Sequence, residues 1–128
     1  MATKTLAYDH PAYLARYSAP VNCQAVAAST PAGKFVAFAA MKAKSIKGIV
    51  DIAGTNTAAG YDVYNGTTSI GEFVCSTNAA GSTLTALTPD ATLAAGGYLD
   101  FKTKANSATL AASFVVEYEL TPGAAITK

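Results

Sequence analysis

Hydrophobic and polar positions alternate most regularly between Ala108 and Leu120. The residues on one parity are apolar or aromatic: Leu110, Ala112, Phe114, Val116, Tyr118 and Leu120. The residues between them are mostly small or polar, and they include Glu117 and Glu119. An alternation of period two over about a dozen residues is typical of a β-strand that buries one face. We therefore expect the even-numbered residues to line a hydrophobic core and the odd-numbered residues to face water or a polar neighbour.

Shorter segments of the same kind precede this strand, separated by residues that favour turns. They cover residues 34–41, 46–53, 61–64, 68–75, 82–88 and 98–102, with residues 88–97 expected to form a connection. Asn65-Gly66 predicts a type I′ turn, and the short segment 104–108 predicts a hairpin between the last two strands. Seven to eight strands with turns roughly every 8 to 14 residues indicate an all-β fold, an antiparallel β-sandwich that is jelly-roll-like.

The segment 34–41 differs from the others because both of its faces are apolar. One face carries Phe35 and Met41, and the other carries Val36 and Phe38. Such a strand is either central to a two-layer structure or covered by another part of the protein. A short helix also fits this segment.

Residues 1–32 contain three tyrosines, three prolines and the only His and Arg of the chain. The prolines interrupt any strand-length alternation, so we expect an irregular, extended N-terminal arm with at most one short helix near Pro11. The segment wraps the domain and covers a sheet edge, docks on a neighbouring subunit or is disordered, and its aromatic content argues against disorder. Tyr and Arg are enriched at the centres of interfaces. The candidate interface residues are Tyr8, His10, Tyr13, Arg16 and Tyr17.

The expected organisation is therefore a single domain with two terminal extensions. Residues 1–32 form the arm, residues 33–122 form the β-sandwich, and residues 123–128 form a C-terminal tail. One domain of this length buries roughly two thirds of the surface of its unfolded chain.

The composition disfavours nucleic-acid and membrane partners. The chain has 9 basic and 8 acidic residues, and only 13% of its residues are charged. Nucleic-acid binding requires a basic stripe, and Lys42, Lys44 and Lys47 are interpreted as a solvated edge. No apolar run reaches the length of a signal peptide or a membrane span. The 28 alanines and many Gly, Ser and Thr residues suit thin, closely packed sheets.

The sequence also lacks recognisable catalytic chemistry. Its only histidine, His10, lies beside Pro11 and outside any nucleophile motif, and the carboxylates are scattered. Cys23 and Cys75 fit no metal-binding spacing. A disulfide between them is one alternative, and two buried or half-buried thiols in a protein made in a reducing cytosol are the favoured one. We expect no catalytic residue, cofactor, metal or small-molecule substrate. A glycan-binding module remains an alternative, with platforms supplied by the aromatic residues Tyr61, Tyr64 and Tyr98.

Three segments carry a resemblance to a known family. They are GTNTAAGYDVYNGTTSIG (54–71), LAAGGYLDFK (93–102) and FVVEYEL (114–120). In this order they resemble the small β-sandwich decoration, or cement, proteins of tailed bacteriophage heads. Phage tail and fibre modules have similar Ala/Gly/Thr-rich segments, and such a module is the alternative among phage structural proteins.

The resemblance implies a non-enzymatic virion structural protein, often a homotrimer, that binds the outer surface of the capsid and stabilises its lattice. The implied partners are the major capsid protein and copies of the chain itself. The implied location is the capsid surface of the virion, after synthesis in the host cytoplasm.

Overall fold

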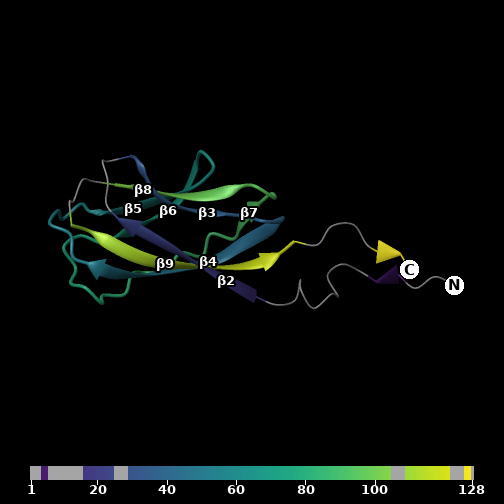
Figure 1. The fold of residues 1–128 in the computed structure, drawn as a ribbon, viewed down its shortest axis with the longest axis horizontal. Helices are drawn as coiled ribbons and strands as arrows, with labels where there is room; N and C mark the ends of the chain where they lie inside the picture. Colours follow the sequence, from purple (N-terminus) through teal and green to yellow (C-terminus); the bar gives the residue numbers. More distant parts are fainter. Residues whose placement is uncertain (1–3, 6–15, 25–28, 105–108, 122–125, 128) are drawn as a thin grey trace.

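The computed structural model describes residues 4–5, 16–24, 29–104, 109–121 and 126–127. The described residues form an all-β structure without a helix. This part of the chain therefore contains no helix that could cross a membrane. Eight strands form two four-stranded antiparallel sheets, and two short strands form a separate ribbon. Figure 1 shows the two sheets as the layers of one body, with the ribbon lying beyond one end.

The first sheet has the order β2-β9-β4-β7, and the second has the order β3-β8-β5-β6. The strands of the first sheet are β2 (Arg16–Gln24), β9 (Ala111–Leu120), β4 (Met41–Ile52) and β7 (Ala91–Leu93). Those of the second are β3 (Pro31–Val36), β8 (Tyr98–Thr103), β5 (Gly60–Asn65) and β6 (Thr68–Val74). The ribbon pairs β1 (Lys4–Thr5) with β10 (Ile126–Thr127).

The antiparallel pairs are nested around a single hairpin. β5 pairs with β6, β4 with β7, β3 with β8, β2 with β9, and β1 with β10. Additional pairs, β4 with β9 and β5 with β8, connect the nested pairs within each sheet. The strands before the β5–β6 turn therefore pair with the strands after it in reverse order. The paired residues are farther apart in sequence toward the two ends of the chain.

Both sheets contribute to one hydrophobic core. The even-numbered residues of β9 confirm the predicted face, because Ala112, Phe114 and Val116 are fully buried. The ring of Phe114 meets three rings of the second sheet, with centroid distances of 5.6 Å to Tyr61, 4.7 Å to Phe73 and 5.0 Å to Phe101. These contacts between the sheets explain why the regular alternation of this strand is the clearest signal in the sequence.

Gly48 in the centre of β4 makes room for this aromatic packing. A Cβ atom at this position would lie 2.6 Å from the ring of Phe114, its partner in register on β9. Real Cβ atoms do not approach a ring so closely, and neither the strand nor the buried ring is free to move. Position 48 therefore requires glycine for packing.

The structure corrects the prediction that residues 1–32 are irregular throughout. Residues 16–24 form β2, a nine-residue strand at the edge of the first sheet. Pro20 misled the prediction, since proline cannot donate to a ladder but is accepted on an edge strand where its nitrogen faces away from the sheet. Pro31 likewise begins β3, another edge strand. The short helix considered near Pro11 lies outside the described residues.

The segment 34–41 is not one central strand. β3 ends at Val36, residues 37–40 form a loop, and β4 begins at Met41. Phe35 and Met41 are buried as expected. Val36 and Phe38 instead face solvent, because no layer of the described structure covers them.

Three local predictions are also wrong. Residues 82–88 form only isolated bridges to β4, at Thr83 and Leu87, whereas the expected connection contains β7. The last two long strands, β8 and β9, belong to different sheets and do not form a hairpin. The β5–β6 turn has Gly66 and Thr67 as its central residues, because Asn65 pairs with Thr68.

The geometry of this turn explains the shift. Gly66 has a φ of 62°, and it is the only residue of the turn with a positive value. A single positive φ at the first central position is typical of type II′, which needs one glycine, whereas type I′ needs positive φ at both positions.

Candidate interaction surface

An aromatic cluster closes the end of the body nearest to the β1–β10 ribbon. Tyr118, near the end of β9, stacks on Tyr17 of β2 with ring centroids 5.7 Å apart. It also contacts Phe35 at 5.6 Å and the edge of Phe38 at 6.1 Å. Tyr118 and Phe35 are buried, Tyr17 is half-buried, and Phe38 is 69% exposed. The cluster therefore continues from the core to the surface.

Backbone hydrogen bonds hold the loop that presents Phe38. The amide of Ala37 donates to Gly97 (2.8 Å), and the amide of Gly96 donates to Ala37 (2.7 Å). At the other end of the loop, the amide of Thr121 donates to the carbonyl of Ala40 (2.9 Å). Phe38 is thus an exposed aromatic side chain on a loop whose backbone is tied to two neighbouring segments.

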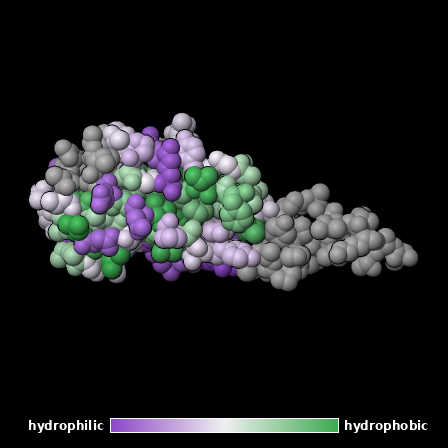
Figure 2. Space-filling view, viewed as in Figure 1, coloured by the Kyte–Doolittle hydropathy of each residue, from purple (hydrophilic) through white to green (hydrophobic). Residues whose placement is uncertain are grey.

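Val36 lies two residues before Phe38 at the end of β3, opposite Tyr98 in register, and 60% of the residue is exposed. We call the surface formed by Val36, Phe38 and Tyr17 the apolar tip. Figure 2 shows hydrophobic residues (green) at the end of the coloured surface that borders the grey atoms. Aromatic residues packed on a fixed support are typical anchors of protein interfaces.

The structure describes two of the five candidate interface residues predicted from the sequence, Arg16 and Tyr17, at the beginning of β2. Tyr17 belongs to the apolar tip, and Arg16 lies on the opposite, outer face of the strand. Tyr8, His10 and Tyr13 lie outside the described residues. Sequence reasoning missed Val36 and Phe38, although the apolar character of both faces of the segment 34–41 was the signal that could have identified them.

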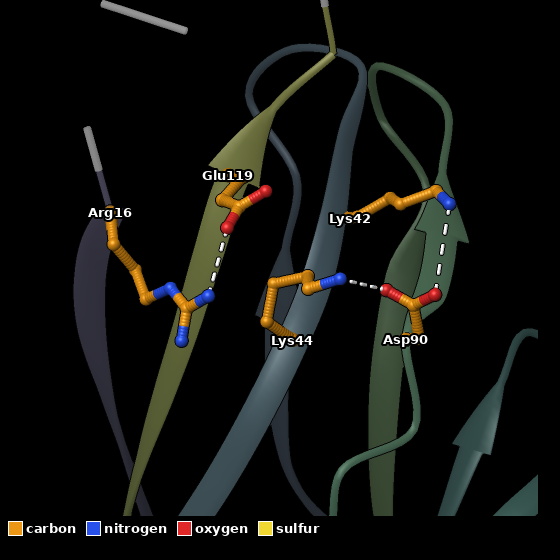
Figure 3. A network of polar contacts seen from close by, with 5 residues as sticks. All are labelled: Arg16, Lys42, Lys44, Asp90 and Glu119. Atoms are coloured by element: carbon orange, nitrogen blue, oxygen red, sulfur yellow. Dashed lines mark hydrogen bonds and ion pairs between the residues drawn. The ribbon is translucent and has the colours of Figure 1, made fainter. Parts of the chain in front are cut away.

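Ion pairs cross the outer face of the first sheet beside the tip (Figure 3). Arg16 pairs with Glu119 at 2.9 Å, and Lys42 lies 3.7 Å from Asp90, which also binds Lys44. The hydrogen bond from Lys44, assisted by the charge of Lys42, lowers the pKa of the Asp90 carboxyl.

Lys47 pairs in the same way with Glu117 at 3.0 Å. Each of the three lysines predicted as a solvated group therefore has a carboxylate partner. Exposed pairs of this kind add little stability, but they arrange charges of both signs in a fixed order on this face.

The sheet edges are protected against pairing with another strand. β2 contains Pro20, β3 contains Pro31 and Lys34, and β7 has only three residues. β6 is bent by an irregularity opposite Val63 and Tyr64. Prolines, lysines, bulges and short edges all disfavour strand addition. Contact with a partner is therefore better served by the apolar tip or by the faces of the sheets.

The outer face of the second sheet carries two of the three tyrosines considered for glycan binding. Tyr64 and Tyr98 are half-buried there, on β5 and β8, whereas Tyr61 points into the core and is fully buried. The ammonium groups of two lysines lie over the outer rings. Lys34 is 4.7 Å from the centroid of Tyr98, and Lys102 is 4.5 Å from that of Tyr64.

Metal ligands and reactive thiols do not converge in the part of the chain that the structure describes. No group of three His, Cys, Asp or Glu side chains lies close enough to hold a metal ion there. Cys23 and Cys75 are buried free thiols, as expected from the sequence. Burial raises the pKa of Cys23 to about 12, with a further contribution from Cys75, and raises the pKa of Cys75 to about 11. Both thiols are therefore protonated at neutral pH.

No protein-family model matches the chain, and the comparisons with curated proteins and with solved structures found no significant match.

Proposed function

We propose that this chain is a non-enzymatic structural protein of a tailed-phage virion, which binds the outer surface of the capsid and stabilises its lattice. The observation that carries this proposal is the apolar tip, where Phe38 is 69% exposed although its loop is held by backbone hydrogen bonds. An exposed aromatic residue costs little conformational entropy on binding when its support is already ordered. A permanent partner on the capsid explains why such a residue stays at the surface.

The topology supports a finer description of the fold as a jelly-roll β-sandwich. Nested antiparallel pairs around one hairpin, divided between two sheets, correspond to a long hairpin folded over on itself. Double-sheet jelly rolls of eight strands are found in viral capsid and lectin domains. This architecture agrees with the family that the sequence resembles, but fold alone does not determine function.

The surface chemistry supports attachment to a protein lattice. The chain has a net charge of +1, and the lysines of the first sheet are paired with carboxylates. Such a surface is poorly suited to the nucleic-acid backbone, where many unpaired cations are needed. We propose the major capsid protein as the partner of the apolar tip, and further copies of the chain, in a homotrimer, as neighbours.

The decisive experiment is co-sedimentation of the purified protein with heads of the encoding phage that lack it. We expect the wild-type protein to pellet with the heads, and a gene for a major capsid protein to lie near the gene for this chain. If the wild-type protein stays in the supernatant at saturating concentrations, the proposed function is wrong.

Matched variants test the surface separately from the function. Val36→Ser and Phe38→Ser should weaken head binding at least tenfold, because they remove the apolar contact. Val74→Ser is the control, since Val74 on β6 is 55% exposed, comparable to Val36 at 60%. The control should bind as the wild type does. If all three variants bind equally well, the lattice contact lies elsewhere.

A further inference from the structure

Asp100 occupies an unusual position on the outer face of the second sheet. It lies in β8 between Lys34 of β3 and Tyr64 of β5, its partners in register. Its neighbours Leu99 and Phe101 face the core, so the side chain of Asp100 points to the outer face. Nevertheless only 5% of the residue is exposed, and its Oδ1 atom is buried without a hydrogen-bond partner among the described residues.

A carboxylate in this situation destabilises the fold. Burial removes water from the oxygen, and no protein donor replaces it. Buried polar groups without hydrogen-bond partners are concentrated at functional sites, where they are retained for binding.

Two pairs of aromatic and basic side chains surround Asp100. Tyr98 and Lys102 lie two positions away on the same strand, so they share its face. Lys34 lies over the ring of Tyr98 at 4.7 Å, and Lys102 lies over the ring of Tyr64 at 4.5 Å. Within the described chain, neither ammonium group lies within ion-pair distance of a carboxylate. Both lysines can therefore leave the rings without breaking an ion pair in this part of the protein.

Charges of both signs lie on this surface. A cationic ligand is attracted by Asp100 but repelled by Lys34 and Lys102, and an anionic ligand is attracted by the two lysines but repelled by Asp100. A neutral molecule with several hydroxyl groups satisfies both kinds of group, since a hydroxyl can donate to Asp100 and accept from a lysine. The flat apolar face of a sugar ring also fits against a tyrosine ring.

We propose that the outer face of the second sheet binds a neutral sugar, with Asp100 as the hydrogen-bond acceptor at its centre and with Tyr64 and Tyr98 as the flanking platforms. Lys34 and Lys102 move from the rings to donate hydrogen bonds to the bound sugar. The site adjoins the apolar tip, because Val36 of the tip is the register partner of Tyr98. Phe38 and Asp100 each belong to only one of the two surfaces, so their variants separate head binding from sugar binding.

The test is saturation-transfer difference NMR on the full chain with glucose, galactose, mannose and N-acetylglucosamine as probes. We expect saturation transfer to at least one of these neutral sugars. Asp100→Asn removes the negative charge and replaces one of the two acceptor oxygens with an amide donor, and Tyr64→Ala removes one platform. Each should weaken the binding at least tenfold. Tyr64→Phe keeps the ring and should bind within about threefold of the wild type.

Ser18→Ala, an exposed substitution on β2 of the other sheet, is the matched control and should leave binding unchanged. The proposal is overturned if none of the four sugars receives saturation. It is also overturned if Asp100→Asn and Tyr64→Ala both bind as the wild type does, or if N-acetylneuraminic acid, an anionic sugar, binds more tightly than every neutral one.

Discussion

At the scale of single residues, the core contains two thiols and a tyrosine hydroxyl that are uncharged at neutral pH. Cys23, Cys75 and Tyr61 are all buried, and burial is the main cause that raises the pKa of each above its ordinary value. A raised pKa means that the folded state keeps its proton at a pH where the unfolded chain has lost it. The contribution of these groups to stability is therefore complete below about pH 9 and decreases at higher pH.

We predict that the free energy of unfolding falls steeply in alkaline solution. Between the ordinary thiol pKa of 9.0 and the raised values of about 11 for Cys75 and about 12 for Cys23, each thiol should remove about 1.4 kcal/mol per pH unit. Urea denaturation between pH 7 and pH 11, followed by circular dichroism, measures this slope. The Cys23→Ala/Cys75→Ala variant should be less stable at pH 7 but show a shallower slope. An unchanged slope in this variant would show that the two thiols do not cause the loss of stability at high pH.

At the scale of elements, β2 is the strand that the sequence does not predict, because prolines interrupt the segment in which it lies. Arg16–Gln24 pairs with β9 over nine positions, and Val21 and Cys23 of its inner face are buried. Burial decreases toward Tyr17, where the core reaches the apolar tip. The strand is therefore a structural edge at one end and part of the candidate interaction surface at the other.

Two N-terminal truncations separate these roles. Removal of residues 1–15 keeps all of β2, so we expect the two four-stranded sheets to form. Removal of residues 1–20 also deletes five cross-strand pairs with β9, from Arg16 to Pro20. At roughly 0.2–1 kcal/mol for each pair, this should cost about 1–5 kcal/mol of stability relative to the shorter truncation. Thermal unfolding of both proteins checks the difference; equal midpoints would show that β2 contributes no stability through this half.

At the scale of the whole molecule, the nested pairing makes most stabilising contacts non-local. Arg16 pairs with Glu119, and even the inner pair of β4 and β7 joins Met41 to Leu93. Among the strands that the structure describes, only β5 and β6 form a local pair. A chain with this topology must close long loops before it gains the corresponding contacts, which slows folding.

We therefore predict refolding in milliseconds to seconds after dilution from urea, as for other all-β domains with non-local pairing. The chain has seven tyrosines and no tryptophan, so stopped-flow tyrosine fluorescence is the suitable probe. Refolding within microseconds would contradict the prediction, since it would require a mostly local folding nucleus.

The candidate surfaces were only partly predictable from the sequence. Residue type identifies Tyr17, and aromatic character identifies Tyr64 and Tyr98. The same criterion also selects Tyr61, which the structure shows to be buried. The sequence predicts Phe38 in a central strand, a covered strand or a short helix, because a single sequence cannot reveal that β3 ends two residues earlier. Asp100 could not be identified at all, since only its neighbours on adjacent strands make it buried.

By itself, the sequence determined the all-β class and the inward face of β9, because alternation of period two is a local consequence of strand geometry. It also determined the β5–β6 hairpin, whose glycine at position 66 sits at positive φ. Only the tertiary structure decided which strands share a sheet, that β8 and β9 separate, and that the edge strand β2 tolerates Pro20. These features depend on partners up to about a hundred residues away, and no local pattern of side chains records them.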